Sequence, residues 1–179
     1  IVQVNNIDIT NAGDRGVEII HTAIDGNSMD ARLTSVNVQA STNESVFVDA
    51  GTNVNIVSLL SMTTAGEVDI NTSNDASLDV TMNGLTVNSN VNMNIDGSGE
   101  FDLRATNIDV TTGNDDVAFL LDLDTSVTSA DVLFESSGAG TSTFTTGDNE
   151  ALLVNSDAAT VRFELNDVTF NNSSATDRT

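Results

Sequence analysis

The sequence of 179 residues contains no cysteine, proline, tryptophan or tyrosine, and its five basic residues are all arginine. The absence of cysteine excludes a disulfide framework and any zinc or iron–sulfur site that needs cysteine ligands. Against the five arginines stand 27 acidic residues, which gives a formal net charge of -22. Because nucleic acid would repel a chain with this charge and no basic patch, we expect no nucleic-acid partner. No run of about 18 apolar residues occurs, so the sequence predicts no membrane-spanning helix.

The charge alone would suit a disordered chain, but the apolar residues argue against disorder. They make up 39% of the sequence and they are patterned, and a chain of this length can bury a substantial core. The composition is otherwise dominated by Asn, Thr, Ser and Asp. The excess of Asp over Glu, together with the absence of Lys, resembles proteins from salty surroundings, where salt screens self-repulsion.

One short unit recurs along the chain: an apolar residue, a polar residue, a second apolar residue, and a polar turn that begins with Thr, Asn or Gln. Its copies are residues 7–11, 36–39, 60–64, 85–88, 108–112 and 168–172, and residues 142–146, which begin with Ser, are a weaker copy. The second apolar residue of each copy serves as a marker, and these markers are Ile9, Val38, Met62, Val87, Val110, Phe144 and Phe170. Successive markers are 23 to 34 residues apart.

Two further short strands are predicted around the copies, one after the turn and one before the marker. Those that follow the turn are residues 17–19, 46–48, 68–70, 91–93, 117–119 and 151–153. Those that precede the marker are residues 2–4, 31–33, 78–80, 101–103, 132–134 and 161–163, with 54–56 as the best match in the remaining coil. Period-two alternation puts one face of each strand inside, where we expect the markers and all seven Phe residues to stack.

Three short strands per repeat describe one coil of a three-sided parallel β-solenoid. The variable coil length does not suit a hexapeptide β-helix, and the G-G-x-G-x-D motif is absent. We therefore predict an all-β, right-handed parallel β-helix of about seven coils. An antiparallel β-sandwich is the alternative, although it would be unusual without Pro, Trp and Tyr. The prediction is one domain, residues 1–179, and a start inside a strand suggests a processed product or a segment of a longer repeat protein.

Acidic turns are the candidate metal sites. The turns at 111–116 and 145–150 align residue for residue, so adjacent coils would bring their carboxylates together. Oxygen ligands of this kind suit calcium, and the predicted ligands are Asp115, Asp116, Asp148 and Glu150. The alternative is a solvated acidic face without an ion. No other cofactor is predicted.

Catalytic chemistry has weaker support. The only histidine, His21, has no distinctive partner in a sequence so rich in Ser and Asp. The carboxylate pair Asp122 and Asp124 could take part in glycoside chemistry, but aromatic platforms and lysine are missing. We expect a non-enzyme. A groove of clustered Asp beside an Arg would favour a carbohydrate-active β-helix, whereas a featureless face and open solenoid ends would favour a scaffold. Two longer segments between strands, 20–30 and 135–141, are candidate binding loops.

Pattern and composition resemble the β-helical repeat regions of large bacterial surface and secreted proteins, such as autotransporter passengers and filamentous adhesins. The closest local match is residues 167–175, whose Phe170, Asn171 and Asn172 look like the Phe-and-Asn repeat of polymorphic outer-membrane proteins. The Gly-Gly-Ala-Ile motif that accompanies this repeat in that family is absent. The resemblance implies a secreted, elongated, non-catalytic module.

The function expected from these observations is a structural or adhesive module of an extracellular or cell-surface protein. Such a module would act as a rigid scaffold, with a glycan or another cell-surface ligand on its lateral face. Open solenoid ends would also permit self-association, end to end, into filaments. The alternative function is a carbohydrate-active β-helix, similar to polysaccharide lyases or hydrolases, that uses acidic side chains.

Overall fold

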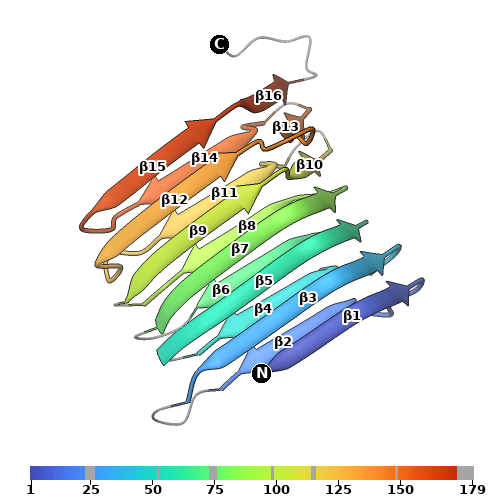
Figure 1. The fold of residues 1–179 in the computed structure, drawn as a ribbon, viewed down its shortest axis with the longest axis horizontal. Helices are drawn as coiled ribbons and strands as arrows, with labels where there is room; N and C mark the ends of the chain where they lie inside the picture. Colours follow the sequence, from blue (N-terminus) through green and yellow to red (C-terminus); the bar gives the residue numbers. More distant parts are fainter. Residues whose placement is uncertain are drawn as a thin grey trace.

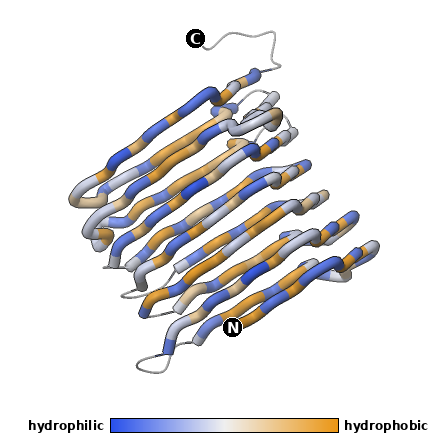
Figure 2. The backbone as a smooth tube through the Cα atoms, in the orientation of Figure 1, coloured by the Kyte–Doolittle hydropathy of each residue, from blue (hydrophilic) through white to orange (hydrophobic). Residues whose placement is uncertain are grey.

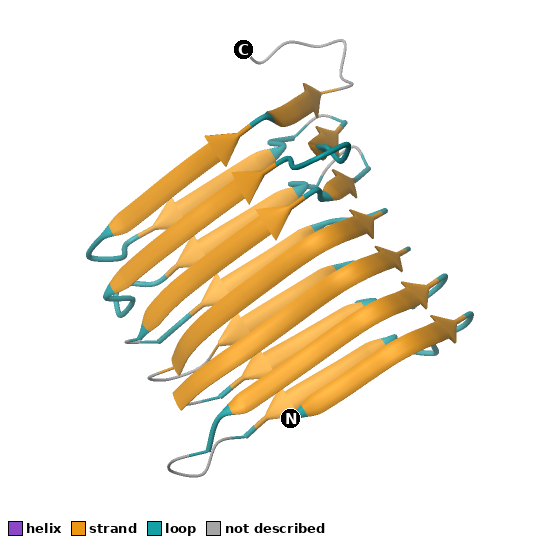
Figure 3. Cartoon of the chain, in the orientation of Figure 1, coloured by secondary structure: helices purple, strands orange, loops and turns teal. Residues whose placement is uncertain are grey.

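The computed structural model describes residues 1–22, 27–51, 53–72, 76–97, 99–113, 116–147 and 149–172. This part of the chain is all β-structure and contains no helix (Figure 3). Every strand pairing between the sixteen strands is parallel. An antiparallel sandwich is therefore excluded for the described residues, and the prediction of a parallel β-solenoid is confirmed.

The strands form two sheets that the chain visits alternately (Figure 1). The larger sheet contains β1 (Val2–Ile9), β3 (Met29–Val38), β5 (Asn53–Thr64), β7 (Ala76–Val87), β9 (Glu100–Thr106), β10 (Asp109–Thr111), β12 (Ser129–Glu135), β13 (Ser142–Thr146), β15 (Val161–Asn166) and β16 (Val168–Asn172). The smaller sheet contains β2 (Val17–His21), β4 (Val46–Ala50), β6 (Val68–Thr72), β8 (Val91–Ile95), β11 (Phe119–Leu123) and β14 (Leu152–Ser156). The chain makes about six turns between β1 and β16.

A bend within the larger sheet supplies the third side of each coil. One residue at the bend has a left-handed backbone, with φ between 52° and 64°: Asn6, Ser35, Ser61, Gly84, Asn107 or Asp167. Such a residue reverses which side chains face inward, so the buried positions of β3 change from Met29, Ala31 and Leu33 to Val36 and Val38. In later coils the same bend separates β9 from β10 and β15 from β16. Three strand segments per coil were correctly predicted. Two of the three sides of the coil, however, belong to the same sheet, so the structure has two sheets and not three.

The register aligns the markers in one inward column, with one exception. Pairing runs through Ile9, Val38, Thr64, Val87, Val110, Phe144 and Phe170. The prediction was wrong for Met62, which pairs with Leu85 in the neighbouring inward column. The reason is the left-handed Ser61: it places Leu60 on the outer surface and moves the inward series to Met62 and Thr64.

The segment 54–56 was also assigned to the wrong face. Asn55 points inward and is fully buried, whereas Val54 is 54% exposed. The Asn55 side-chain amide donates to the carbonyl oxygens of Gly51, at 2.8 Å, and Asn53, at 3.0 Å. The buried amide therefore holds the turn between β4 and β5, which explains a polar residue inside the coil.

Apolar side chains fill the interior. Figure 2 shows hydrophobic and hydrophilic residues alternating along the strands. The core is bulkiest in the later coils, as predicted, because Phe119, Phe134 and Phe144 pack edge to face with ring centroids 5.0–5.8 Å apart. Phe47 was wrongly placed inside. It lies on the outer surface, where the guanidinium of Arg15 sits 3.7 Å from its ring centroid and covers it.

We expect Thr64→Val to raise stability. The Thr64 hydroxyl is buried in the marker column and has no hydrogen-bond partner. Valine has nearly the same shape and removes this unpaired group, so the gain should be about 1 kcal/mol, or roughly 2–4 °C in melting temperature. Thr63→Val is the matched control, because Thr63 is exposed on the same strand. Circular dichroism melts that show equal shifts for both variants would contradict this account of Thr64.

Candidate functional site

The two acidic turns of the calcium prediction do lie on adjacent coils. The Thr112 amide donates to the Thr145 carbonyl at 3.0 Å, and the Thr146 hydroxyl donates to the Asp116 carbonyl at 3.1 Å. The Ala118 amide donates to the Glu150 carbonyl at 3.2 Å. The alignment of these turns in the sequence therefore reflects their stacking in space.

The four predicted calcium ligands are only partly described. Asp115 and Asp148 lie outside the described residues, while Asp116 and Glu150 are exposed. Among the residues that the structure describes, no three His, Asp or Glu side chains come together in a metal-binding arrangement. Calcium binding at these turns stays a prediction.

Other candidates from the sequence have structural partners. The carboxylate of Asp124 accepts hydrogen bonds from the Ser126 amide at 3.0 Å and from the Ser126 and Thr125 hydroxyls. These bonds, led by the Ser126 amide, lower the pKa of Asp124 and close the turn after β11. Asp122, in contrast, points outward from β11 and lines a small recess with Asn71 and Asn94. The two carboxylates therefore do not act as a pair.

His21 also has a structural partner. Its Nδ1 atom is 3.0 Å from the Oδ1 atom of Asn55. Since the Asn55 amide nitrogen already donates to two carbonyl groups, its Oδ1 atom must accept, and the Nδ1 atom of His21 carries the hydrogen. His21 thus links the end of β2 to Asn55 near the start of β5.

Of the two candidate loops, only one is fully described, because residues 23–26 of the other lie outside the described residues. The loop at 135–141 is held by Asn107, whose Oδ1 atom accepts from the Ser137 amide at 2.8 Å. Its far end is fixed by Ser142, whose hydroxyl donates to the Glu135 carbonyl at 2.6 Å. Gly140 passes so close to Asn107 that a Cβ atom there would collide with the asparagine side chain.

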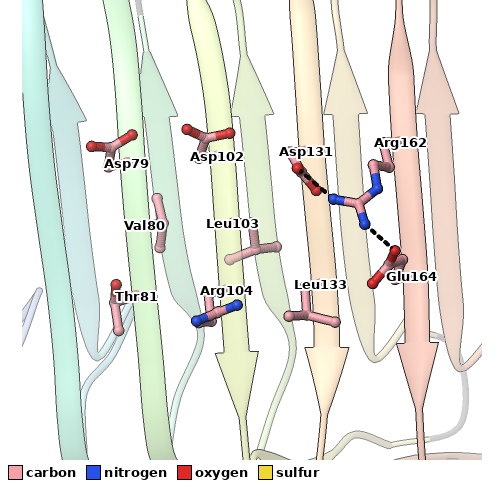
Figure 4. Close-up of a pocket in the computed structure, with 10 residues that line it drawn as sticks. All are labelled: Asp79, Val80, Thr81, Asp102, Leu103, Arg104, Asp131, Leu133, Arg162 and Glu164. Carbon is pink, nitrogen blue, oxygen red and sulfur yellow. Dashed lines mark hydrogen bonds and ion pairs between the residues drawn. The ribbon is translucent and has the colours of Figure 1, made fainter.

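The structure reveals a groove that the sequence analysis did not identify. Asp79, Asp102 and Asp131 stand in register on β7, β9 and β12, and Arg162 on β15 continues the row. A second outward row, two residues further along each strand, consists of Thr81, Arg104, Leu133 and Glu164 (Figure 4). The groove between these rows has a volume of about 460 Å³. We refer to it as the Asp groove.

Stacked parallel strands place these carboxylates at close, regular intervals. Neighbouring strands lie about 4.8 Å apart, so Asp79 and Asp131 are separated by roughly twice this distance across Asp102. Partial burial, followed by the charges of Asp79 and Asp131, raises the pKa of Asp102. Like charges in register are unfavourable, and here they recur on three successive strands.

Two arginines lie at the Asp groove and differ in their partners. Arg162 donates from Nη1 to Asp131 at 3.1 Å and from Nη2 to Glu164. Arg104 occupies the row beside Asp102 and forms no ion pair with any residue that the structure describes. The groove therefore offers hydrogen-bond acceptors in one row and a guanidinium in the other, which is suited to a ligand rich in hydroxyl groups.

The outer surface of the smaller sheet carries a contrasting row. There the in-register residues are Asp49, Asn71, Asn94, Asp122 and Asn155, so amides separate the carboxylates. The nearby Asp69 accepts a hydrogen bond from Asn71 at 3.1 Å, although desolvation still raises the pKa of Asp69. On this surface, amide side chains lie between the carboxylates and relieve their repulsion. In the Asp groove the carboxylates are direct neighbours, and the repulsion remains.

We expect Asp102→Asn to raise the melting temperature slightly at neutral pH. A carboxyl whose pKa is raised on folding opposes folding when it is ionised, and this opposition disappears as the pH falls toward its unfolded pKa. The gain of about 1–2 °C at pH 7 should therefore vanish near pH 4.

Asp30→Asn is the matched control, for which we expect the melting temperature to change in the opposite direction. Asp30 lies in the same outward row, but its hydrogen bond from Arg32, at 2.8 Å, lowers the pKa of Asp30. Its contribution is present at neutral pH and is lost as the pH falls through the lowered pKa, so Asp30→Asn should reduce stability at pH 7. If both variants shift the melting temperature in the same direction at pH 7, the account of Asp102 is wrong.

No protein-family model, curated protein or solved structure matches this chain. The described residues also contain no helix that is long and apolar enough to cross a membrane.

Proposed function

We propose that this chain is a non-catalytic structural or adhesive module of an extracellular or cell-surface protein. The observation that carries the proposal is the unbroken parallel register from β1 to β16, in which every coil is hydrogen-bonded to the next. Continuous ladders of this kind resist bending and give a stiff support with a long lateral surface. The acidic outer rows are available to a glycan or another cell-surface ligand.

We propose a right-handed solenoid of seven coils. Connections between parallel strands of one sheet are right-handed in about 98% of cases, which supports this hand. The path from β1 to β16 through the larger sheet contains seven rungs, which supports the number of coils.

Surface labelling tests the localisation and the role as a scaffold. An antibody raised against residues 1–179 should label intact cells of the source organism or material shed from these cells. Brief treatment of intact cells with protease should remove this signal, and an antibody against a cytoplasmic protein is the control. Labelling that requires permeabilised cells would overturn the proposal.

The Asp groove supports a second candidate, a carbohydrate-active β-helix. Clustered Asp residues beside Arg104 and Arg162 are the feature that favours this candidate over a featureless scaffold. Neighbouring carboxylates about 5 Å apart occur in retaining glycosidases, and wider pairs occur in inverting ones. No aromatic residue lines the groove, however, and a sugar ring would have no platform there.

A cleavage assay separates the two candidates. The purified chain is incubated with neutral polysaccharides and with polyuronides, and new reducing ends and unsaturated products are measured. We expect none. Products that form with the parent chain but not with Asp102→Asn would overturn the non-catalytic proposal in favour of the carbohydrate-active enzyme.

Calcium at the two stacked turns can be tested in the same preparations. Melting with millimolar calcium is compared with melting in sodium chloride of equal ionic strength, because a specific oxygen site acts well below the concentration needed for general screening. A shift that is specific to calcium, and that is lost in Asp116→Asn combined with Asp148→Asn, would support the site. Equal melting curves in both salts would exclude it.

A further inference from the structure

The Asp groove contains an acid and a base that are placed to pair and do not. On three strands of the larger sheet an acidic residue and an arginine lie two positions apart and face outward: Asp30 and Arg32 on β3, Asp102 and Arg104 on β9, and Arg162 and Glu164 on β15. The pair on β3 is joined by hydrogen bonds of 2.8 and 2.9 Å, and the pair on β15 is also hydrogen-bonded. Within the described part of the chain, Arg104 forms neither a hydrogen bond nor an ion pair. Two opposite charges therefore lie side by side in the groove without pairing.

The acidic row beside Arg104 is neutralised at one position only. Arg162 donates to Asp131 at 3.1 Å, as the dashed line in Figure 4 shows. Asp79 and Asp102 are direct neighbours in register, and neither is paired with an arginine among the described residues. The free acceptor atoms of the row are thus concentrated on β7 and β9, next to the free donors of Arg104.

The stacking of the coils sets the spacing of these groups. Asp79 and Asp102 are one strand apart, about 4.8 Å, which is close to the length by which one hexose unit extends a linear glycan. Arg104 lies two residues along the strand from Asp102, roughly 7 Å away. The groove volume of about 460 Å³ falls within the range of sites that bind small molecules. A linear glycan that follows the row would place one sugar on each coil.

The chemistry of the two rows selects among glycans. Ionised carboxylates only accept hydrogen bonds, and protonated amines give them stronger, charge-assisted bonds than hydroxyl groups do. Arg104 only donates, so it needs an acceptor such as a sugar hydroxyl or ring oxygen. Leu133, half-buried beside Arg104 in register, offers an apolar contact for the C–H groups of a sugar ring. The net charge of -22 opposes an acidic glycan.

We propose that the Asp groove binds a linear glycan whose sugars carry free, protonated amino groups. The ammonium groups donate to Asp79 and Asp102, and sugar oxygens accept from Arg104. This inference rests on the proposed adhesive module and names the class of its ligand. Charge-assisted hydrogen bonds take the place of the aromatic platform that the groove lacks.

Three probes of related structure test the ligand class by isothermal titration calorimetry of the chain 1–179. The first is the β-1,4-linked tetramer of glucosamine, at about pH 6, where its amines are protonated and carboxylates are largely ionised. Spermine carries the same number of positive charges without hydroxyl groups, and the N-acetylated tetramer has the same sugar chain without charge. The glucosamine tetramer should bind at least about tenfold more tightly than either of the other probes, because it alone satisfies both rows.

Two double variants locate the binding. Asp79→Asn combined with Asp102→Asn should weaken binding of the glucosamine tetramer at least about tenfold, since it removes both ionic acceptors. The matched control is Asp49→Asn combined with Asp122→Asn, which removes the same charge from the outer row of the smaller sheet. This control should bind almost as the parent does. Far-UV circular dichroism verifies that both variants fold.

Arg104→Gln separates recognition of a sugar from attraction of a cation. The variant loses the donor to the sugar oxygens, and it also loses a positive charge that repels spermine. The preference for the glucosamine tetramer over spermine should therefore fall toward equality. An unchanged preference in Arg104→Gln would overturn the role of Arg104 in the site.

Other results would overturn the proposal as a whole. Equal binding of spermine and the glucosamine tetramer to the parent chain would mean that the groove attracts cations without recognising a sugar. Equal weakening by the two double variants would mean that only the overall charge matters, and absence of binding would exclude the ligand. These failures are distinguishable from failure of the proposed module, because surface labelling of cells does not depend on any of the probes. A chain that labels intact cells and binds no probe would retain the module and exclude the amino glycan.

Discussion

Replacement of Val87 by aspartate is expected to unfold the middle coils. Val87 is completely buried, and its neighbours in the marker column are Thr64 and Val110. A carboxylate at this position would have no charged partner, and the penalty of several kcal/mol is a large part of the 5–15 kcal/mol that stabilises a typical domain. Far-UV circular dichroism should show reduced strand content and a urea transition at much lower concentration, or none.

The matched control is Asn83→Asp on the same strand. Asn83 is exposed on the outer surface, so the variant adds the same charge without burying it. It should melt close to the parent chain. If Val87→Asp were as stable as Asn83→Asp, the position would not be inside the solenoid and the register of β7 would be wrong.

The destabilisation caused by a buried aspartate should depend on which coil carries it. Each coil contacts only its neighbours, so a defect in the middle separates the stack into two shorter pieces, whereas a defect at the end removes one coil. Ile9, the first member of the same column, is only partly buried. Ile9→Asp should therefore destabilise the chain less than Val87→Asp in the same urea titration.

The sequence predicted the solenoid because a parallel stack repeats its environment on every coil. Equivalent positions meet the same neighbours, so apolar residues recur at the inward positions and polar turns recur after them. Six of the seven markers stand in one column for this reason. The stacking of the two acidic turns followed from the same logic.

The left-handed bend limited the accuracy of the prediction within each coil. Periodicity describes a strand with uniform alternation, and one left-handed residue shifts the alternation without changing the composition. Ser61 is an ordinary strand residue by type, so the change of face between Leu60 and Met62 has no clear signal in the sequence. A further exception is Phe47, which points outward because Val46 and Val48 on either side of it are buried, and whose ring is covered by the Arg15 guanidinium.

The Asp groove was overlooked although part of its signal is present. The runs 78–80 and 101–103 both have Asp between two apolar residues, and stacking equivalent runs would have placed Asp79 beside Asp102. The third Asp was missed because the run in that coil was framed as 132–134, whereas the register aligns Asp131 with Asp102. A shift of two residues along a strand assigns the same side chains to the inward face. The apolar pattern therefore gave no sign that the run had been placed two residues too late.

Truncation of Phe134 to alanine is expected to produce the largest loss among the neutral core substitutions. Its ring packs edge to face on Phe119, with centroids 5.0 Å apart, and on Phe144, at 5.4 Å. It also contacts Phe163 in the next coil, at 5.8 Å. Removing a fully buried ring typically destabilises a protein by about 3–5 kcal/mol, and each edge-to-face pair adds roughly 0.5–1.5 kcal/mol.

Two comparisons isolate the role of the ring. Phe134→Leu retains most of the volume and should recover much of the loss, because leucine fills part of the cavity. Phe170→Ala removes a ring that is 43% exposed and stacks on Phe144 alone among the aromatic residues of the described part, so it should destabilise the chain much less than Phe134→Ala. The chain has no Trp or Tyr, so urea titrations are followed by circular dichroism. Equal losses for Phe134→Ala and Phe170→Ala would mean that the edge-to-face cluster does not hold the later coils together.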